Sequence, residues 1–169
     1  RLHRSGELEE RAERAHEVLR DCVLCPRECH VNRIEDETGF CRTGLLPVAA
    51  SYNPHFGEEP PLVGRRGSGT IFFSGCSMRC DYCQNFDISQ GGVGYAISCD
   101  DLAGVMLRLQ EMGCHNINLV TPTHVVPQIL LTVTIAAGRG LRIPLVYNSG
   151  GYDSVETLRL LEGVIDIYM

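Results

Sequence analysis

A short run between residues 75 and 84 carries three cysteines, Cys76, Cys80 and Cys83. The run directly follows the apolar segment 70–74, and no fourth cysteine stands close behind it. Thiolates are soft ligands for iron–sulfur clusters, and a four-iron cube needs one ligand for each iron. Three thiolates leave one iron open. Such an iron can bind a small molecule, whereas ordinary electron carriers close all four positions.

The CxxxCxxC spacing, with Tyr82 before the last cysteine, resembles the motif of the radical S-adenosylmethionine (SAM) superfamily. The resemblance extends to the runs 83–90, 113–124 and 146–152, which look like an uncharacterised branch near the pyruvate formate-lyase activating enzymes. It implies a [4Fe-4S] cluster whose open iron takes the amino and carboxylate groups of SAM. Reductive cleavage of SAM would then give a 5′-deoxyadenosyl radical that abstracts hydrogen. The alternatives for the three cysteines are a zinc site or unrelated buried thiols.

The expected activity is therefore that of a radical SAM oxidoreductase, similar to the activases of glycyl radical enzymes. In that family the hydrogen comes from a glycine of a partner protein, so a protein or peptide substrate is expected, with a small molecule as the alternative. An electron donor such as a ferredoxin or flavodoxin is also implied. Two other classes stay open: a ferredoxin-like electron carrier and a non-catalytic module stapled by metal.

The resemblance also assigns residues to the cluster loop and to bound SAM. Tyr82 would meet the adenine through its ring or backbone, with simple packing of the loop as the alternative. Asn85 matches a position shared with the activating enzymes, where it would hold the cluster loop by hydrogen bonds.

The second strand of the family ordinarily ends in a Gly-Gly-Glu type motif that receives the SAM amino group. Here the corresponding run, 120–124, contains no carboxylate, so Thr121 and Thr123 would substitute through hydroxyls or carbonyls. His124 is a further candidate contact, with helix capping or a surface position as the alternative. After the third strand, Asn148 and Ser149 precede two glycines and are expected to contact SAM; a glycine turn is the structural alternative.

A second group of cysteines lies nearer the N-terminus, with the spacing Cys22-x2-Cys25-x3-Cys29-x11-Cys41. Four thiolates can build a closed zinc site or hold an auxiliary iron–sulfur cluster. Spacing and charge do not decide between the two metals. The remaining cysteines, Cys99 and Cys114, stand alone and are expected to be small buried side chains.

The chain alternates strand and helix patterns, which favours an α/β fold with parallel βαβ units. We expect a helix at 6–21, a cysteine-rich knot at 22–44, and a long ordered loop or short hairpin at 47–69. After it we expect strands near 70–74, 117–121, 143–147 and 164–168, and helices near 100–112, 125–138 and 154–162. Asp100 or Asp101 is expected to cap the first of these helices, and Asp153 or Ser154 the last.

Two segments are expected: 1–46 with the N-terminal helix and cysteine-rich metal segment, and 47–169 with the radical SAM core. The family uses a partial (β/α) barrel with its cluster loop after the first strand. About four strands would make only the first half of that barrel. Because the chain stops on an apolar strand, we expect it to be a fragment or an incomplete gene product.

Composition limits the classes of partner. The net charge of −6 argues against a broad nucleic-acid-binding face. No apolar stretch approaches the roughly 20 residues that a membrane-spanning helix needs. Nine cysteines at metal-ligand spacings fit a reducing cytoplasm better than a disulfide framework.

Overall fold

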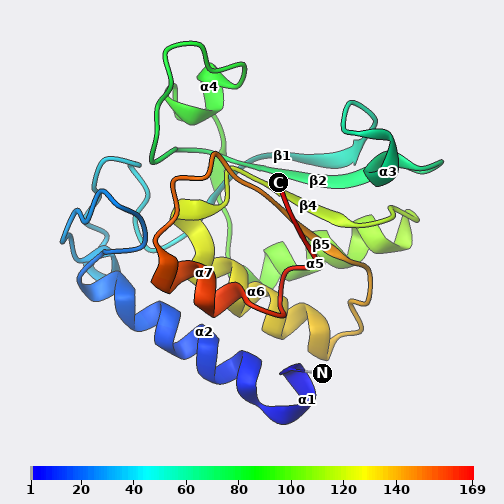
Figure 1. The fold of residues 1–169 in the computed structure, drawn as a ribbon, viewed down its shortest axis with the longest axis horizontal. Helices are drawn as coiled ribbons and strands as arrows, with labels where there is room; N and C mark the ends of the chain where they lie inside the picture. Colours follow the sequence, from blue (N-terminus) through cyan, green and yellow to red (C-terminus); the bar gives the residue numbers. More distant parts are fainter. Residues whose placement is uncertain (1) are drawn as a thin grey trace.

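A computed structural model describes residues 2–169 (Figure 1). Its centre is a six-stranded mixed sheet with the strand order β3-β1-β2-β4-β5-β6. Strands β2, β4, β5 and β6 run parallel, while β1 is antiparallel to both of its neighbours. The strands are β1 (Val48–His55), β2 (Ser68–Phe73), β3 (Tyr95–Ala96), β4 (Ile117–Val120), β5 (Leu145–Asn148) and β6 (Ile167–Tyr168). The predicted α/β class is confirmed.

Helices α5, α6 and α7 lie along one face of this sheet, and α2 packs outside α6 (Figure 1). The α-helices are α1 (Leu2–Ser5), α2 (Glu7–Glu17), α3 (Pro60–Val63), α4 (Phe86–Ser89), α5 (Cys99–Glu111), α6 (Val126–Gly138) and α7 (Val155–Leu161). Short 3-10 turns are η1 (Val18–Arg20), η2 (Arg33–Glu35) and η3 (Thr123–Val125). No helix among residues 2–169 combines the length and apolar character needed to cross a membrane.

Strand β1 is the main departure from the expected order of elements. The segment was expected to be a loop or short hairpin because prolines and glycines punctuate it. It is a strand of the sheet, paired with β2 from Ala49 to His55. Strand β3 reaches only Val48 and Ala49, so the rest of β1 is an edge, where Pro54 is tolerated. Pairing with β2 therefore outweighs the local preference of proline and glycine for turns.

Helix caps explain where α5 and α7 begin. Ser98, rather than Asp100 or Asp101, caps α5, and its hydroxyl accepts the Asp101 N–H at 3.0 Å. The prediction of an aspartate cap for α5 is wrong, because Ser98, the residue directly before the helix, supplies the acceptor. Ser154 caps α7 by accepting the Thr157 N–H at 3.2 Å, which leaves Asp153 for another role.

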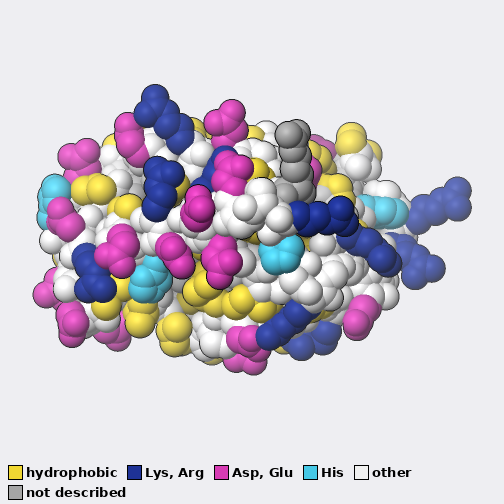
Figure 2. Space-filling model, turned by 90° about the horizontal axis from the view of Figure 1, so that it is seen from below, with side chains coloured by type: hydrophobic (Ala, Val, Ile, Leu, Met, Phe, Trp, Pro, Cys, Tyr) yellow, Lys and Arg dark blue, Asp and Glu magenta, His cyan; other side chains and the backbone are white. Residues whose placement is uncertain are grey.

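The N-terminal helix shares the core of the sheet. Leu8, Ala12 and Ala15 of α2 are buried in the same apolar cluster as the strands and α6. Figure 2 shows acidic and basic side chains intermingled over the face that carries α2. The helix is therefore amphipathic, as its sequence predicts.

The parallel strands bring their carboxyl ends to one edge of the sheet. Strand β2 is followed there by the long segment 74–94, from which α4 rises away from the sheet (Figure 1). The ends of β4 and β5 follow at the same edge, because Phe72 pairs with Val120 and Val120 with Asn148. Segments that are far apart in sequence thus meet beside the cysteine loop.

Two adjacent leucines of α6 provide a matched test of the packing. Leu130 is fully buried, whereas Leu131 is 38% exposed. We expect Leu130→Ala to lower the free energy of unfolding by about 2–5 kcal/mol, since it leaves a cavity between α6 and its neighbours. Leu131→Ala should cost under about 1 kcal/mol. Urea unfolding followed by circular dichroism measures both, and equal losses would contradict the packing described.

Candidate functional site

The loop that carries Cys76, Cys80 and Cys83 is closed by its own hydrogen bonds. The Ser74 hydroxyl donates to the Ile88 carbonyl at 2.8 Å, and the Gly75 N–H donates to the same oxygen at 3.0 Å. Farther out, the Gln90 side-chain amide donates to the Cys80 carbonyl at 3.0 Å. The three thiols are half-buried. The loop therefore has a defined shape before any cofactor binds.

Two of these thiols already have polar neighbours. The Met78 backbone N–H donates to the Cys76 sulfur at 3.3 Å, and the Cys83 sulfur lies 3.2 Å from the Ser89 hydroxyl. Among residues 2–169 no three His, Cys, Asp or Glu side chains are placed to hold one metal ion. A cube makes a different demand from a single ion, because each thiolate binds its own iron.

The structure places the two other predicted residues of this loop on its outside. Tyr82 is 88% exposed, so its ring is free to meet a ligand rather than packed into the loop. Asn85 is exposed, and its carbonyl accepts the N–H groups of Ile88 and Ser89 at 3.2 and 2.9 Å. Its side chain forms no hydrogen bond within residues 2–169. Asn85 therefore shapes the loop through its backbone.

The predicted threonine and asparagine contacts lie together at the carboxyl ends of β4 and β5. The Thr121 N–H donates to the Asn148 carbonyl at 3.0 Å. Thr121 has a φ of 58°, a left-handed conformation that is strained for a β-branched residue by about 1–3 kcal/mol. Strain of this kind concentrates at functional sites.

Contact between the cysteine loop and the turn after β5 is direct. The Met78 thioether lies so close to Gly150 that a side chain at position 150 would collide with it. The methionine side chain is flexible and could move aside, so this contact shows that the two segments lie against each other but does not require glycine at position 150. The cysteine loop and the Asn148–Ser149 turn border the same space.

The most connected polar group at this edge is the carboxylate of Asp153, which was predicted only as a helix cap. It accepts hydrogen bonds from the hydroxyls of Thr123 at 2.6 Å, Tyr147 at 2.7 Å, Ser149 at 2.7 Å and Tyr168 at 2.9 Å. Thr123 and Ser149, both predicted SAM contacts, thus share one carboxylate partner. The sequence does place four hydroxyl residues near three strand ends. They can be recognised as partners of Asp153 only once the strand order is known.

Burial and the neighbouring carboxylate keep the tyrosine donors protonated. Burial raises the pKa of Tyr147 far above its usual value, and the charge of Asp153 raises it further. The pKa of Tyr168 is raised by the same two causes. Both phenols therefore donate to Asp153 at physiological pH.

His124 lies behind the cysteine loop, not at the open strand edge where a SAM contact was expected. Its side chain is 98% buried, since only 2% of the residue is exposed, and its Nε2 donates to the Ser74 carbonyl at 2.9 Å. Its own carbonyl accepts a hydrogen bond from Arg33 at 2.8 Å. Burial lowers the pKa of His124 to about 4, with a smaller contribution from the Arg33 charge. The neutral imidazole has no partner for Nδ1 within residues 2–169.

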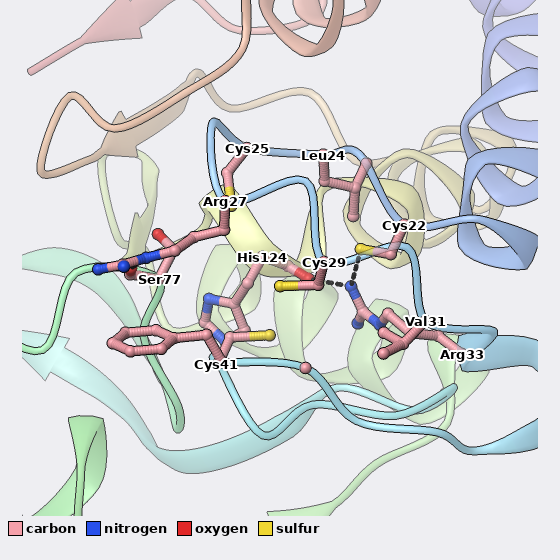
Figure 3. A pocket seen from close by; sticks show the side chains of 12 residues that line it. Cys22, Leu24, Cys25, Arg27, Cys29, Val31, Arg33, Cys41, Ser77 and His124 are labelled. Atoms are coloured by element: carbon pink, nitrogen blue, oxygen red, sulfur yellow. Dashed lines mark hydrogen bonds between the residues drawn. The ribbon is translucent and has the colours of Figure 1, made fainter.

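The four N-terminal cysteines line one cavity (Figure 3). Cys22 is buried, and Cys25, Cys29 and Cys41 are half-buried. Burial raises the pKa of Cys25, and the other three thiols raise it further because they are close enough for their negative charges to repel. The predicted set is therefore brought together in space, with His124 and Ser77 in the same cavity wall.

Arg27 and Arg79 join this N-terminal segment to the cysteine loop. The Arg27 Nε donates to the Ser77 carbonyl at 2.9 Å. The guanidinium carbons of Arg27 and Arg79 lie 3.7 and 4.6 Å from the centre of the Phe40 ring, within cation–π range. Neither arginine was singled out from the sequence, because the contact joins segments about 50 residues apart.

Comparison with known proteins finds a relative that covers most of this chain. An uncharacterised protein, MJ0674 of Methanocaldococcus jannaschii, is 35% identical over 171 aligned residues, which cover 96% of this chain and 48% of the relative. The chain thus spans about half the length of the curated relative it matches. No family model matches the chain. No solved structure matches it either.

The Asp153 cluster can be tested through stability. In the parent protein all four hydroxyls donate to Asp153. An asparagine side chain has only one oxygen acceptor, and its NH₂ group would face hydroxyls that also act as donors. We expect Asp153→Asn to lower the free energy of unfolding by about 1–3 kcal/mol. The matched control is Asp81→Asn, because Asp81 is exposed and its side chain has no hydrogen-bond partner among residues 2–169. It should stay within about 0.5 kcal/mol of the parent protein. Equal denaturation midpoints for the two variants would contradict the structural role of the cluster.

Proposed function

We propose that this chain carries the cluster site of a radical SAM enzyme. The observation that carries the proposal is the hydrogen-bonded loop bearing Cys76, Cys80 and Cys83 at the carboxyl end of β2, next to polar strand ends. Three thiolates on one preformed loop suit a [4Fe-4S] cube with one open iron, and the adjoining edge supplies polar groups for a ligand on it. The sequence motif and this placement support the same chemistry.

The chemistry that the bound, reduced cluster would supply is one-electron cleavage of SAM to a 5′-deoxyadenosyl radical. The protein's share is to hold the cluster, orient the ligand and exclude water. The exposed Tyr82 ring is available to adenine, and Asn85 keeps the turn beside it in shape. Asn148 and Thr121, joined at 3.0 Å, offer polar atoms at the adjoining strand ends.

Asp153 gives this edge the carboxylate that the run 120–124 lacks. Hydroxyls occupy the four acceptor positions of this carboxylate, so it would stabilise a protonated amino group through its negative charge and not through a further hydrogen bond. Thr123 and Ser149 hold the Asp153 carboxylate at the strand ends, 2.6 and 2.7 Å away. We therefore assign these two residues an indirect role in SAM binding: they position Asp153.

The proposed architecture is a partial (β/α) barrel, of which β2, β4, β5 and β6 form a parallel part. The hydrogen donor is proposed to be a glycine of a partner protein, and the electron donor a ferredoxin or flavodoxin. A cytoplasmic location is proposed from the nine free thiols, which a reducing compartment preserves.

The test is anaerobic reconstitution with iron and sulfide, followed by electron paramagnetic resonance of the reduced protein with and without SAM. Cys80→Ala should abolish the part of the signal that SAM changes, because it removes one of the three ligands of the open-iron cube. Cys99→Ala is the matched control, since Cys99 lies at the start of α5, outside both cysteine groups. It should leave the SAM-sensitive signal unchanged.

A cluster signal that SAM does not alter would contradict the proposal and favour an electron carrier. A colourless protein that retains zinc alone would favour a metal-stapled module. Loss of the signal in Cys99→Ala but not in Cys80→Ala would contradict the assigned ligands.

A further inference from the structure

The cavity lined by Cys22, Cys25, Cys29 and Cys41 could hold either a zinc ion or an iron–sulfur cluster, and its surroundings bear on which of the two it binds. It is enclosed mainly by apolar atoms and cysteine side chains, and it lies between the N-terminal segment and the cysteine loop (Figure 3). All four thiols border it, although the spacing alone leaves both zinc and an iron–sulfur cluster open. The position of the cavity against the loop of Cys76, Cys80 and Cys83 favours a cluster, because a redox centre there can pass electrons to the open-iron site.

A single ion would demand closely gathered thiols. At a Zn–S distance of about 2.3 Å, the sulfurs of a tetrahedral site lie within about 4 Å of one another. Among residues 2–169 no three candidate ligands are placed to hold one ion, even though these four border one space. The four thiols border one space, and a cube suits such a set because each thiolate binds a different iron.

Charge also favours an anionic occupant. Arg33 is only 1% exposed and forms no ion pair with any Asp or Glu in the described part of the chain. Its guanidinium donates to the carbonyls of Gly44 and His124, and it lies 4.0 Å from the Cys22 sulfur (Figure 3). A buried cation without an anion is costly. Four thiolates around a [4Fe-4S]²⁺ core carry a net charge of −2 and would offset it. Four thiolates on one Zn²⁺ carry the same charge, so Arg33 indicates an anionic metal centre of either kind.

The cavity shares a wall with the loop of Cys76, Cys80 and Cys83. Ser77, the neighbour of Cys76, lines the cavity and is buried. Gly75 approaches the Cys41 carbonyl so closely that a Cβ there would lie 2.5 Å from the oxygen. One layer of backbone therefore separates the two groups of thiols.

We propose that Cys22, Cys25, Cys29 and Cys41 bind a second, fully ligated [4Fe-4S] cluster, and that this cluster passes electrons to the open-iron site. A reduced one-electron donor, of the ferredoxin or flavodoxin class, reduces the N-terminal cluster by one electron. That electron then moves to the cluster at Cys76, Cys80 and Cys83, and the N-terminal cluster returns to its oxidised state. The second cluster stands on its own cavity, whereas the electron route rests on the proposed function.

The cluster is tested in a full-length variant that lacks the other site, with Cys76, Cys80 and Cys83 all changed to alanine. After anaerobic reconstitution we expect about four iron and four sulfide per chain, and a reduced cube signal that ignores SAM. One zinc, one iron without sulfide, or no metal would overturn the proposal. This result does not depend on SAM chemistry, so its failure is distinct from failure of the proposed function.

Arg33 gives a second readout on the same variant. Its positive charge stabilises the more negative, reduced cluster, so Arg33→Gln should lower the midpoint potential, and Arg33→Lys should restore most of it. The comparison uses iron-loaded protein of each variant. Equal potentials in all three proteins would overturn the assignment of Arg33 to this cluster.

The electron route is tested with the open-iron site intact. In Cys25→Ala/Cys29→Ala we expect reduction of the open-iron cluster by a reduced flavodoxin to slow at least tenfold. Reduction by a small chemical reductant should stay within twofold of the parent, which shows that the open-iron cluster itself is intact. Equal slowing with both reductants, or no slowing with either, would overturn the route.

Discussion

A buried chain of hydrogen bonds through His124 holds the two cysteine groups against each other. Arg33 donates to the His124 carbonyl, and the His124 imidazole donates to the Ser74 carbonyl, directly before the cysteine loop. His124 sits at the end of β4, so the chain joins the N-terminal segment, the sheet and the loop. Polar groups this deeply buried are costly when unpaired, and each therefore fixes the place of the next.

The edge of the parallel strands depends on a second polar centre. Asp153 gathers hydroxyls from the ends of β4, β5 and β6, and its neighbour Ser154 starts α7. Ser154 therefore caps α7, while Asp153 holds the hydroxyl side chains at the strand ends in place. Thr121 adds a strained backbone at the same edge, which persists because the pairing with Asn148 and the buried strands around it hold it in place.

The two centres give the cysteine loop different neighbours on its two sides. Behind it lie His124, the buried Arg33 and the N-terminal thiols; in front lie the Gly150 turn and the Asp153 cluster. The proposed electron route uses the first side and the proposed ligand contacts use the second. This division explains how a short loop can be both enclosed and accessible, with Tyr82 exposed at its tip.

The sequence by itself determined the α/β class, the positions of the parallel strands and their helices, and the two groups of cysteines. Apolar periodicity and ligand spacing are local, so they can be read along the chain. It could not give β1, because Pro54 is typical of a loop until β2 is known to pair with the segment. Nor could it give the cap of α5, where Asp101 is the hydrogen-bond partner of the capping Ser98 and not the cap itself. Only the tertiary structure decided that Asp153 serves three strand ends, that His124 is buried, and that Arg33 lies beside Cys22. Those roles depend on contacts between residues up to 91 positions apart, and no local pattern records them.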